Sequence, residues 1–248
     1  MNLRAIGRLA HALLHALGGL ATIVFLFPRR DEPRRNARVQ AWALRMLAIL
    51  GVQIELRGQV PAAGPVMLAA NHISWLDILV MHAARHCRFV AKSEVRHWPL
   101  IGRLATGAGT LYIERESRRD AMRVVHHMAD SLRRGEVVAV FPEGTTSDGV
   151  ALLPFHGNLI QAAISANAPV VPVGLSFIET RSRERSLTPC YVGDDTLAAS
   201  VWRTLSGRPI TAVVHFGEPE YAKGRSRREW AAGLREAVAA LRAQEPAP

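Results

Sequence analysis

Two short polar strings carry residue types that can do acid–base chemistry, and each directly follows an apolar run. The first string holds His72 and Asp77, five positions apart, after the run PVMLAA. In a continuous helix, side chains five positions apart point about 140° from one another and could not pair. With His72 in a turn and Asp77 in the first turn of a following helix, the carboxylate can orient one ring nitrogen and leave the other free to take a proton from a hydroxyl. This spacing indicates a general base, although a capping role for Asp77 and a simple turn role for His72 also fit the string.

The second string, FPEGTT at residues 141–146, follows the apolar run VVAV. Pro and Gly are common where a strand passes into a loop, so an ordinary turn is one interpretation. Both strings, however, stand at the carboxyl ends of predicted strands. In open α/β sheets, ligands bind outside those strand ends. We therefore expect the two strings to lie at one site.

The elements that must position these strings alternate along the chain. Helix-like segments separate seven runs rich in β-branched residues and bounded by Gly or Pro, which is typical of strands. The predicted strands are residues 53–57, 66–70, 88–91, 110–113, 137–141, 170–177 and 211–216. One helix is expected from the Ser74-to-Asp77 capping-box pattern and another from the pattern Ser226 to Glu229. The interleaving predicts an α/β fold with a mostly parallel central sheet and helices on both faces.

The N-terminal part has a different character, because residues 9–27 carry no formal charge. A membrane-spanning helix needs about 20 apolar residues, a length that this stretch just reaches. Residues 1–40 hold seven arginines against two acidic residues, a net charge of +5 that anionic lipid attracts. We expect a helical membrane-anchoring segment, either spanning or interfacial. A buried core helix and a signal peptide are the alternatives, but no small-residue cleavage site follows.

A second apolar stretch at residues 42–52 is expected to pack beside the first as a helical hairpin. We accordingly predict N-terminal membrane-associated helices over residues 1–52 and a catalytic domain over residues 53–248. Basic residues are denser after the apolar stretch than before it, which favours a cytoplasmic location for the catalytic part. The alanine- and arginine-rich composition suggests a bacterial source, and hence the cytoplasmic face of the inner membrane.

Other classes of function fit the sequence less well. The net charge of +10 also suits a noncatalytic binder of nucleic acid or anionic membrane. Its arginines are scattered, however, and the aromatic content is only 6%, so we expect no nucleic-acid partner. A zinc site built from His82, His86 and Cys87 lacks a further spaced pair of ligands, so we expect no metal.

Four strings of this chain, in order, resemble the sequence blocks of the glycerolipid acyltransferase family, which makes phosphatidic acid from lysophosphatidic acid. The block His-(four residues)-Asp matches His72 and Asp77, with Asn71 before it. The second block resembles GTLYIER at residues 109–115, the third matches FPEGT at 141–145, and the fourth matches VPV at 171–173. The resemblance covers about residues 65–180, and the ordered set is far more specific than any single block.

The resemblance implies that His72, oriented by Asp77, is the general base on a lysolipid hydroxyl. This hydroxyl would attack the thioester of acyl-CoA or of an acidic acyl carrier protein, a co-substrate that makes a further cofactor unnecessary. Arg115 and the turn Glu143, Gly144 and Thr145 would hold the acceptor headgroup. Lys92, one of only two lysines, is a weaker candidate for binding phosphate, and a solvated surface role suits it equally well.

One departure from the family pattern concerns the acceptor. Many family members that use lysophosphatidic acid carry Arg after FPEGT, where this chain has Thr146. A hydroxyl cannot replace the bidentate, charged contact of a guanidinium with phosphate. Relatives that acylate lyso-ornithine lipid resemble this Thr-Thr version. The four-block resemblance still favours lysophosphatidic acid or another lysophospholipid as the acceptor, and Thr146 makes lyso-ornithine lipid the alternative.

Overall fold

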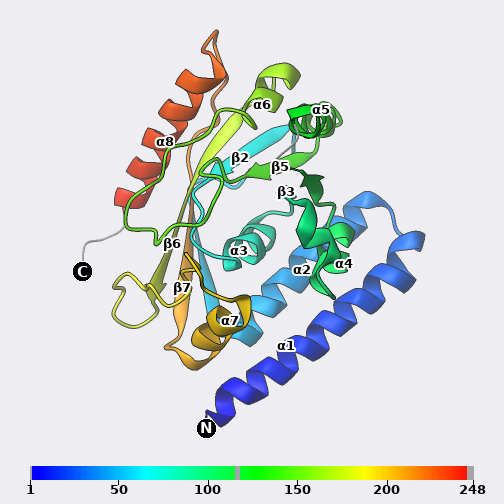
Figure 1. Cartoon of the computed structure of the whole chain (residues 1–248), viewed down its shortest axis with the longest axis vertical. Helices are drawn as coiled ribbons and strands as arrows, with labels where there is room; N and C mark the ends of the chain where they lie inside the picture. Colours follow the sequence, from blue (N-terminus) through cyan, green and yellow to red (C-terminus); the bar gives the residue numbers. More distant parts are fainter. Residues whose placement is uncertain (1, 115–117, 245–248) are drawn as a thin grey trace.

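A seven-stranded sheet with helices on both faces forms the centre of the computed structural model, which describes residues 2–114 and 118–244 (Figure 1). Its strand order is β1-β7-β6-β2-β5-β3-β4, and β6 and β7 are antiparallel while the other neighbouring pairs are parallel. The strands are β1 Val52–Arg57, β2 Val66–Ala70, β3 Arg88–Lys92, β4 Leu111–Ile113, β5 Val137–Val140, β6 Val170–Glu179 and β7 Ile210–Phe216. The α-helices are α1 Leu3–Ala21, α2 Glu32–Leu50, α3 Leu76–Ala84, α4 Ile101–Gly107, α5 Arg118–Arg133, α6 Gln161–Ala166, α7 Leu197–Ser206 and α8 Arg227–Ala243. The described residues also form a short π-helix, η1 Thr22–Leu26, and two short 3-10 helices, η2 Phe27–Arg29 and η3 Ser93–His97.

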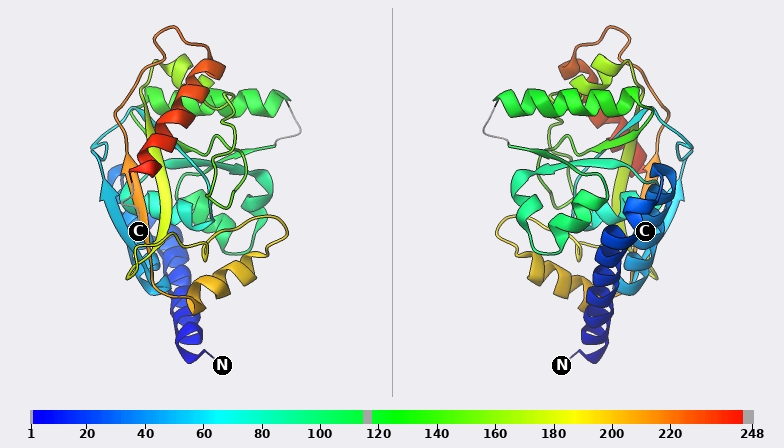
Figure 2. Two further views of the ribbon diagram at one scale, coloured as in Figure 1. Left: turned by 90° about the vertical axis from the view of Figure 1, so that its left-hand side faces the viewer. Right: turned by 90° about the vertical axis from the view of Figure 1, so that its right-hand side faces the viewer.

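The seven predicted strands are confirmed, with their ends within two residues of the predicted ones. Successive residues of a strand point to opposite faces, so each central strand supplies two hydrophobic cores. In β2, Leu68 and Ala70 belong to the core shared with α2 and α3. Met67 and Ala69 belong to the core shared with α5, α6 and α8 on the other face. Figure 2 shows these two helical layers from the side, and the predicted α/β class is confirmed.

The N-terminal helices form the predicted hairpin, in which α1 packs against α2. Asp31 caps α2 by accepting a hydrogen bond from the backbone N–H of Arg34 at 3.1 Å, and Gly51 ends the helix with a φ of 81°. Helix α2 packs in turn on α3, and α1 contacts α4 and α7. The helical segment Leu3–Arg29 is long and apolar enough to cross a membrane. Within the described part of the chain, α1 lies along the outside of the molecule (Figure 1).

Candidate functional site

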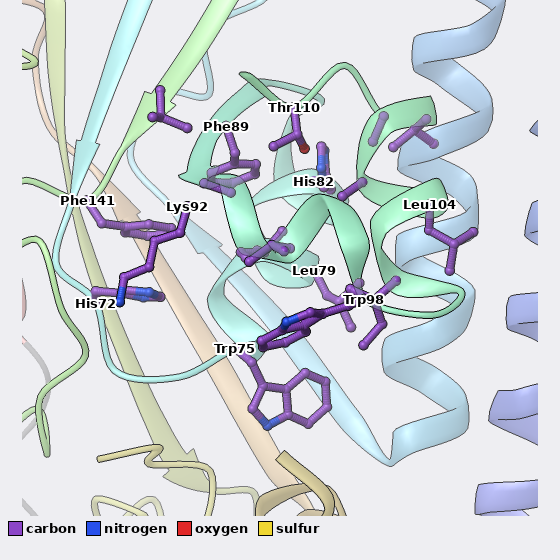
Figure 3. A pocket seen from close by; sticks show the side chains of 18 of the residues that line it. His72, Trp75, Leu79, His82, Phe89, Lys92, Trp98, Leu104, Thr110 and Phe141 are labelled. Carbon is purple, nitrogen blue, oxygen red and sulfur yellow. The ribbon is translucent and has the colours of Figure 1, made fainter. Parts of the chain in front are cut away.

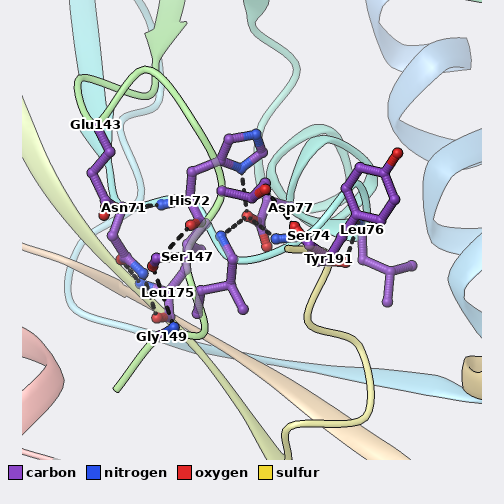
Figure 4. Close-up of polar contacts among 12 residues, drawn as sticks. Asn71, His72, Ser74, Leu76, Asp77, Glu143, Ser147, Gly149, Leu175 and Tyr191 are labelled. Carbon is purple, nitrogen blue, oxygen red and sulfur yellow. Dashed lines mark hydrogen bonds and ion pairs between the residues drawn. The ribbon is translucent and has the colours of Figure 1, made fainter. Parts of the chain in front are cut away.

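His72 and Asp77 meet as their spacing predicts. His72 lies in the turn after β2, and Asp77 is the second residue of α3. His72 Nδ1 is 2.7 Å from Asp77 Oδ2, and this oxygen also accepts the backbone N–H groups of Ile73 at 2.6 Å and Ser74 at 2.9 Å (Figure 4). Because a carboxylate only accepts, the shared hydrogen belongs to Nδ1, which leaves Nε2 as the ring's acceptor. Asp77 is 0% exposed, whereas the His72 side chain is 18% exposed and lines a cavity.

The start of α3 differs from the predicted capping box. The Ser74 hydroxyl accepts a hydrogen bond from the N–H of Leu76 at 3.2 Å rather than from Asp77, whose N–H donates to the Ser74 carbonyl at 3.1 Å. The half of the box that forms is the contact between the Asp77 carboxylate and the Ser74 N–H. Asp77 therefore holds the turn that carries His72 as well as the imidazole itself.

Glu143 is buried behind the His72 turn, with 3% exposure. Its Oε1 accepts the backbone N–H of His72 at 2.7 Å, and its Oε2 accepts that of Leu153 at 2.9 Å. Burial raises the pKa of the carboxyl, and the two N–H donors counter part of this rise by favouring the charged form. With both oxygens bound to backbone, Glu143 joins two loops. Glu143 also lines the cavity beside His72, and its contact with a headgroup stays a prediction.

Two further side chains that the sequence left without a role hold the turn in place. Phe141 stacks on the His72 ring, with a centroid distance of 4.0 Å and an angle of 7° between the planes. Asn71 ties the end of β2 to β6, because it accepts the N–H of Leu175 at 2.7 Å and donates to its carbonyl at 3.0 Å. Both stand inside the polar strings, which is the one signal that could have found them. Leu175, 104 residues from Asn71, gives no such signal.

A large, open cavity of about 2030 Å³ adjoins His72 (Figure 3). Its walls include Lys92, Glu143, Gly144 and Thr145, so four of the five expected headgroup residues share it with His72. They come together because β2, β5 and β3 are neighbouring parallel strands whose carboxyl ends meet at one edge of the sheet. Arg115 lies outside the described residues. The remaining wall is largely apolar and includes side chains of α1, α2 and α4.

Figure 3 shows His82 among the residues that line the apolar part of this cavity. Its ring meets Phe89 edge-on at 5.1 Å, and burial lowers its pKa to about 3. Burial also lowers the pKa of His86 to about 4. Both rings are therefore neutral at pH 7. Within residues 2–114 and 118–244, no three His, Cys, Asp or Glu side chains are grouped so that they could hold a metal ion.

Comparison with known proteins identifies the family. The family model described as Acyltransferase matches residues 51–176. The chain is 37% identical to the lyso-ornithine lipid O-acyltransferase of Pseudomonas aeruginosa over 96% of this chain and 93% of that protein. It is 39% identical to the 1-acyl-sn-glycerol-3-phosphate acyltransferase of Neisseria gonorrhoeae over 73% of this chain and 71% of that protein.

The crystal structure of the 1-acyl-sn-glycerophosphate acyltransferase PlsC from Thermotoga maritima has the same fold. The two structures give a TM-score of 0.69 at 20% identity, over 98% of this chain and 100% of that one. Motif order, fold and full-length relatives agree with the resemblance of the four strings. This chain therefore belongs to the acyltransferase family, as an enzyme that acylates lysolipids.

Proposed function

We propose that His72 is the general base of acyl transfer from a thioester donor to a lysolipid hydroxyl, and that Asp77 orients it. The observation that carries this proposal is the 2.7 Å contact between Nδ1 and the Asp77 carboxylate at the wall of the cavity. The contact fixes the tautomer and stabilises the imidazolium that forms when Nε2 takes a proton. Phe141, stacked on the ring, restricts its rotation.

The reaction follows from these positions. Nε2 of His72 removes the proton of the acceptor hydroxyl as its oxygen attacks the thioester carbonyl carbon. The tetrahedral intermediate collapses, the C–S bond breaks, and the thiolate takes the proton back from the imidazolium. An ester and a free thiol result, and no metal or organic cofactor enters the balance. Acyl-CoA and acyl carrier protein both supply the required thioester.

The acceptor that we propose is lyso-ornithine lipid. The relative of that name matches nearly the whole chain, and Thr146 replaces the Arg that many lysophosphatidic acid acyltransferases carry. The Thr146 hydroxyl, moreover, donates to the backbone carbonyl of Tyr191. Lysophosphatidic acid, which the sequence motifs favour, is the second candidate, because the Neisseria relative is named for that substrate and the ammonium group of Lys92 lies at the cavity.

Helix α1 is proposed to lie in the plane of the membrane interface rather than to span the bilayer. Ala5, Ala16 and Gly19 are buried against the protein along its length, whereas Leu14 and Leu17 are 68% and 54% exposed. A spanning helix would have to leave its contacts with α4 and α7. The exposed apolar face, flanked by the arginines of residues 1–40, suits an anionic leaflet, and we place it at the cytoplasmic surface.

The deciding experiment is an assay of the purified protein in mixed micelles with acyl-CoA and acyl carrier protein thioesters. Lyso-ornithine lipid and lysophosphatidic acid are offered separately, with His72→Ala as the control. We expect faster turnover of lyso-ornithine lipid by the unchanged protein and a loss of about 10²- to 10⁴-fold in the variant. Faster turnover of lysophosphatidic acid would reverse the order of acceptors, and a fully active His72→Ala enzyme would refute the mechanism.

A further inference from the structure

We propose that Tyr191 binds the acceptor headgroup, its phenolic hydroxyl donating a hydrogen bond to an anionic headgroup oxygen. The inference rests on the proposed function, since it assigns a residue to the acceptor of that reaction. Tyr191 lies in the segment between β6 and α7, outside the four sequence strings. It lines the same cavity as His72.

The backbone of Tyr191 is clamped between the two turns that form the site. Its N–H donates to the carbonyl of Ile73, the residue after His72, at 3.1 Å. Its carbonyl accepts the hydroxyl of Thr146, the residue after Thr145. Because the N–H of Tyr191 is bound to the His72 turn and its carbonyl to the FPEGTT turn, its backbone is fixed relative to His72 (Figure 4).

Helix α7 holds the rest of this segment. The Arg203 guanidinium donates to the carbonyl of Thr188 at 2.9 Å and to that of Cys190 at 2.6 Å, and it pairs with Asp195. The helix is itself joined to the His72 turn, because the indole N–H of Trp75 donates to the Ser200 hydroxyl at 3.0 Å. The carbonyl next to Tyr191 is therefore fixed by a charged donor, which restricts movement of Tyr191 away from the site.

The Tyr191 side chain itself is only partly buried, and its hydroxyl makes no hydrogen bond to the described part of the chain. A half-buried phenol with an unused donor at a cavity wall suits a polar ligand group. Thr146, by contrast, already donates its hydroxyl hydrogen bond to the Tyr191 carbonyl. Where a guanidinium would contact the ligand directly, Thr146 instead positions Tyr191.

The shared chemistry of the ligand is an anionic oxygen beside an acyl chain. Both proposed acceptors offer one, as the carboxylate of ornithine or as the phosphate of lysophosphatidic acid. The phenol and the ammonium group of Lys92 supply one positive charge together, whereas Lys92 and an arginine at position 146 would supply two. This donor set suits the single charge of a carboxylate better than a phosphate monoester.

The test is Tyr191→Phe, which removes only the hydroxyl, with Tyr221→Phe as a matched control. Tyr221 is exposed and lies outside the cavity lining. We expect Tyr191→Phe to raise the KM of the acceptor by about 10- to 100-fold, the range for a hydrogen bond to a charged group, with kcat and donor KM changed less than twofold. The increase should be larger for lyso-ornithine lipid than for lysophosphatidic acid. Thr146→Val should act in the same direction and add little in the Tyr191→Phe background, because both act through one contact.

An acceptor KM within twofold of that of the unchanged protein would overturn the proposal, as would a fall in kcat alone. These results differ from failure of the proposed function, in which the unchanged protein itself turns over neither lipid. In that case calorimetric binding of lyso-ornithine lipid and lysophosphatidic acid in detergent still decides the matter. A weaker Kd for Tyr191→Phe than for Tyr221→Phe supports the role of Tyr191, and equal Kd values refute it.

Discussion

The Glu143 carboxylate accepts the backbone N–H of His72 at 2.7 Å, although 71 residues separate the two in the chain. The contact joins the carboxyl ends of β2 and β5, which are neighbouring parallel strands. Since the other oxygen of Glu143 holds Leu153, one buried side chain fixes both the turn of the proposed base and the loop after the FPEGTT string. We therefore expect Glu143 to orient the His72 turn, a role that is separate from the predicted contact with the headgroup.

Glu143→Gln should therefore lower kcat by about 100-fold, the cost of a misplacement near 1 Å, and leave the acceptor KM nearly unchanged. The glutamine amide would present N–H to one of the two backbone N–H groups that the carboxylate now accepts. Steady-state kinetics with both substrates varied provides the measurement, and exposed Glu218→Gln is the matched control. A raised acceptor KM at unchanged kcat would instead assign Glu143 to the headgroup.

Asp77→Asn tests whether orientation of the imidazole matters beyond its presence. The amide no longer stabilises an imidazolium, and it can favour the wrong tautomer of His72, so kcat should fall by about 10²- to 10⁴-fold. The double variant with His72→Ala should be no slower than the His72→Ala enzyme, because the two residues act as a unit. Single-turnover rates measure both effects, and additive losses would show that Asp77 acts independently of His72.

Burial of His82 should make stability depend on pH. Its pKa is lowered to about 3, against about 6.5 in an unfolded chain, so between these values only the unfolded chain binds the proton. Because protons bind only to the unfolded chain in this range, the free energy of unfolding decreases as the pH falls. For His82 the expected decrease between pH 7.5 and 5 is about 2 kcal/mol. His86 acts in the same direction. Urea unfolding at both pH values should show His82→Phe losing about 2 kcal/mol less than the unchanged protein; equal losses would contradict the prediction.

Replacing Leu14 and Leu17 by Glu should release the protein from anionic vesicles. Both side chains are exposed on α1, where each would lose apolar burial in the lipid and meet negative charge. Vesicle sedimentation measures the bound fraction, and Val150→Glu, which places a charge at an exposed apolar position outside α1, is the control. Unchanged sedimentation of the Leu14 and Leu17 double variant would rule out this face as the membrane contact.

Much of the fold follows from local pattern. The seven strands match runs of β-branched residues bounded by Gly or Pro, because strand geometry depends on side chains a few positions apart. The pairing of His72 with Asp77 is also local, since both lie within one turn and the start of α3. The convergence of Gly144 and Thr145 on His72 could be expected because parallel strands bring their carboxyl ends to one edge.

Only the tertiary structure shows which distant side chains hold the His72 turn and which line the cavity beside it. The sequence predicts Glu143 as a headgroup-binding residue, and its hydrogen bond with the backbone of His72 forms because β5 lies beside β2. Thr146 is joined to Tyr191 across 45 residues, and only the fold brings that segment onto the site. Such contacts depend on strand order and register, which combine segments far apart in the chain. A sequence pattern predicts hydrogen bonding and burial within one helix or strand. It does not indicate which distant helix or strand packs beside that element.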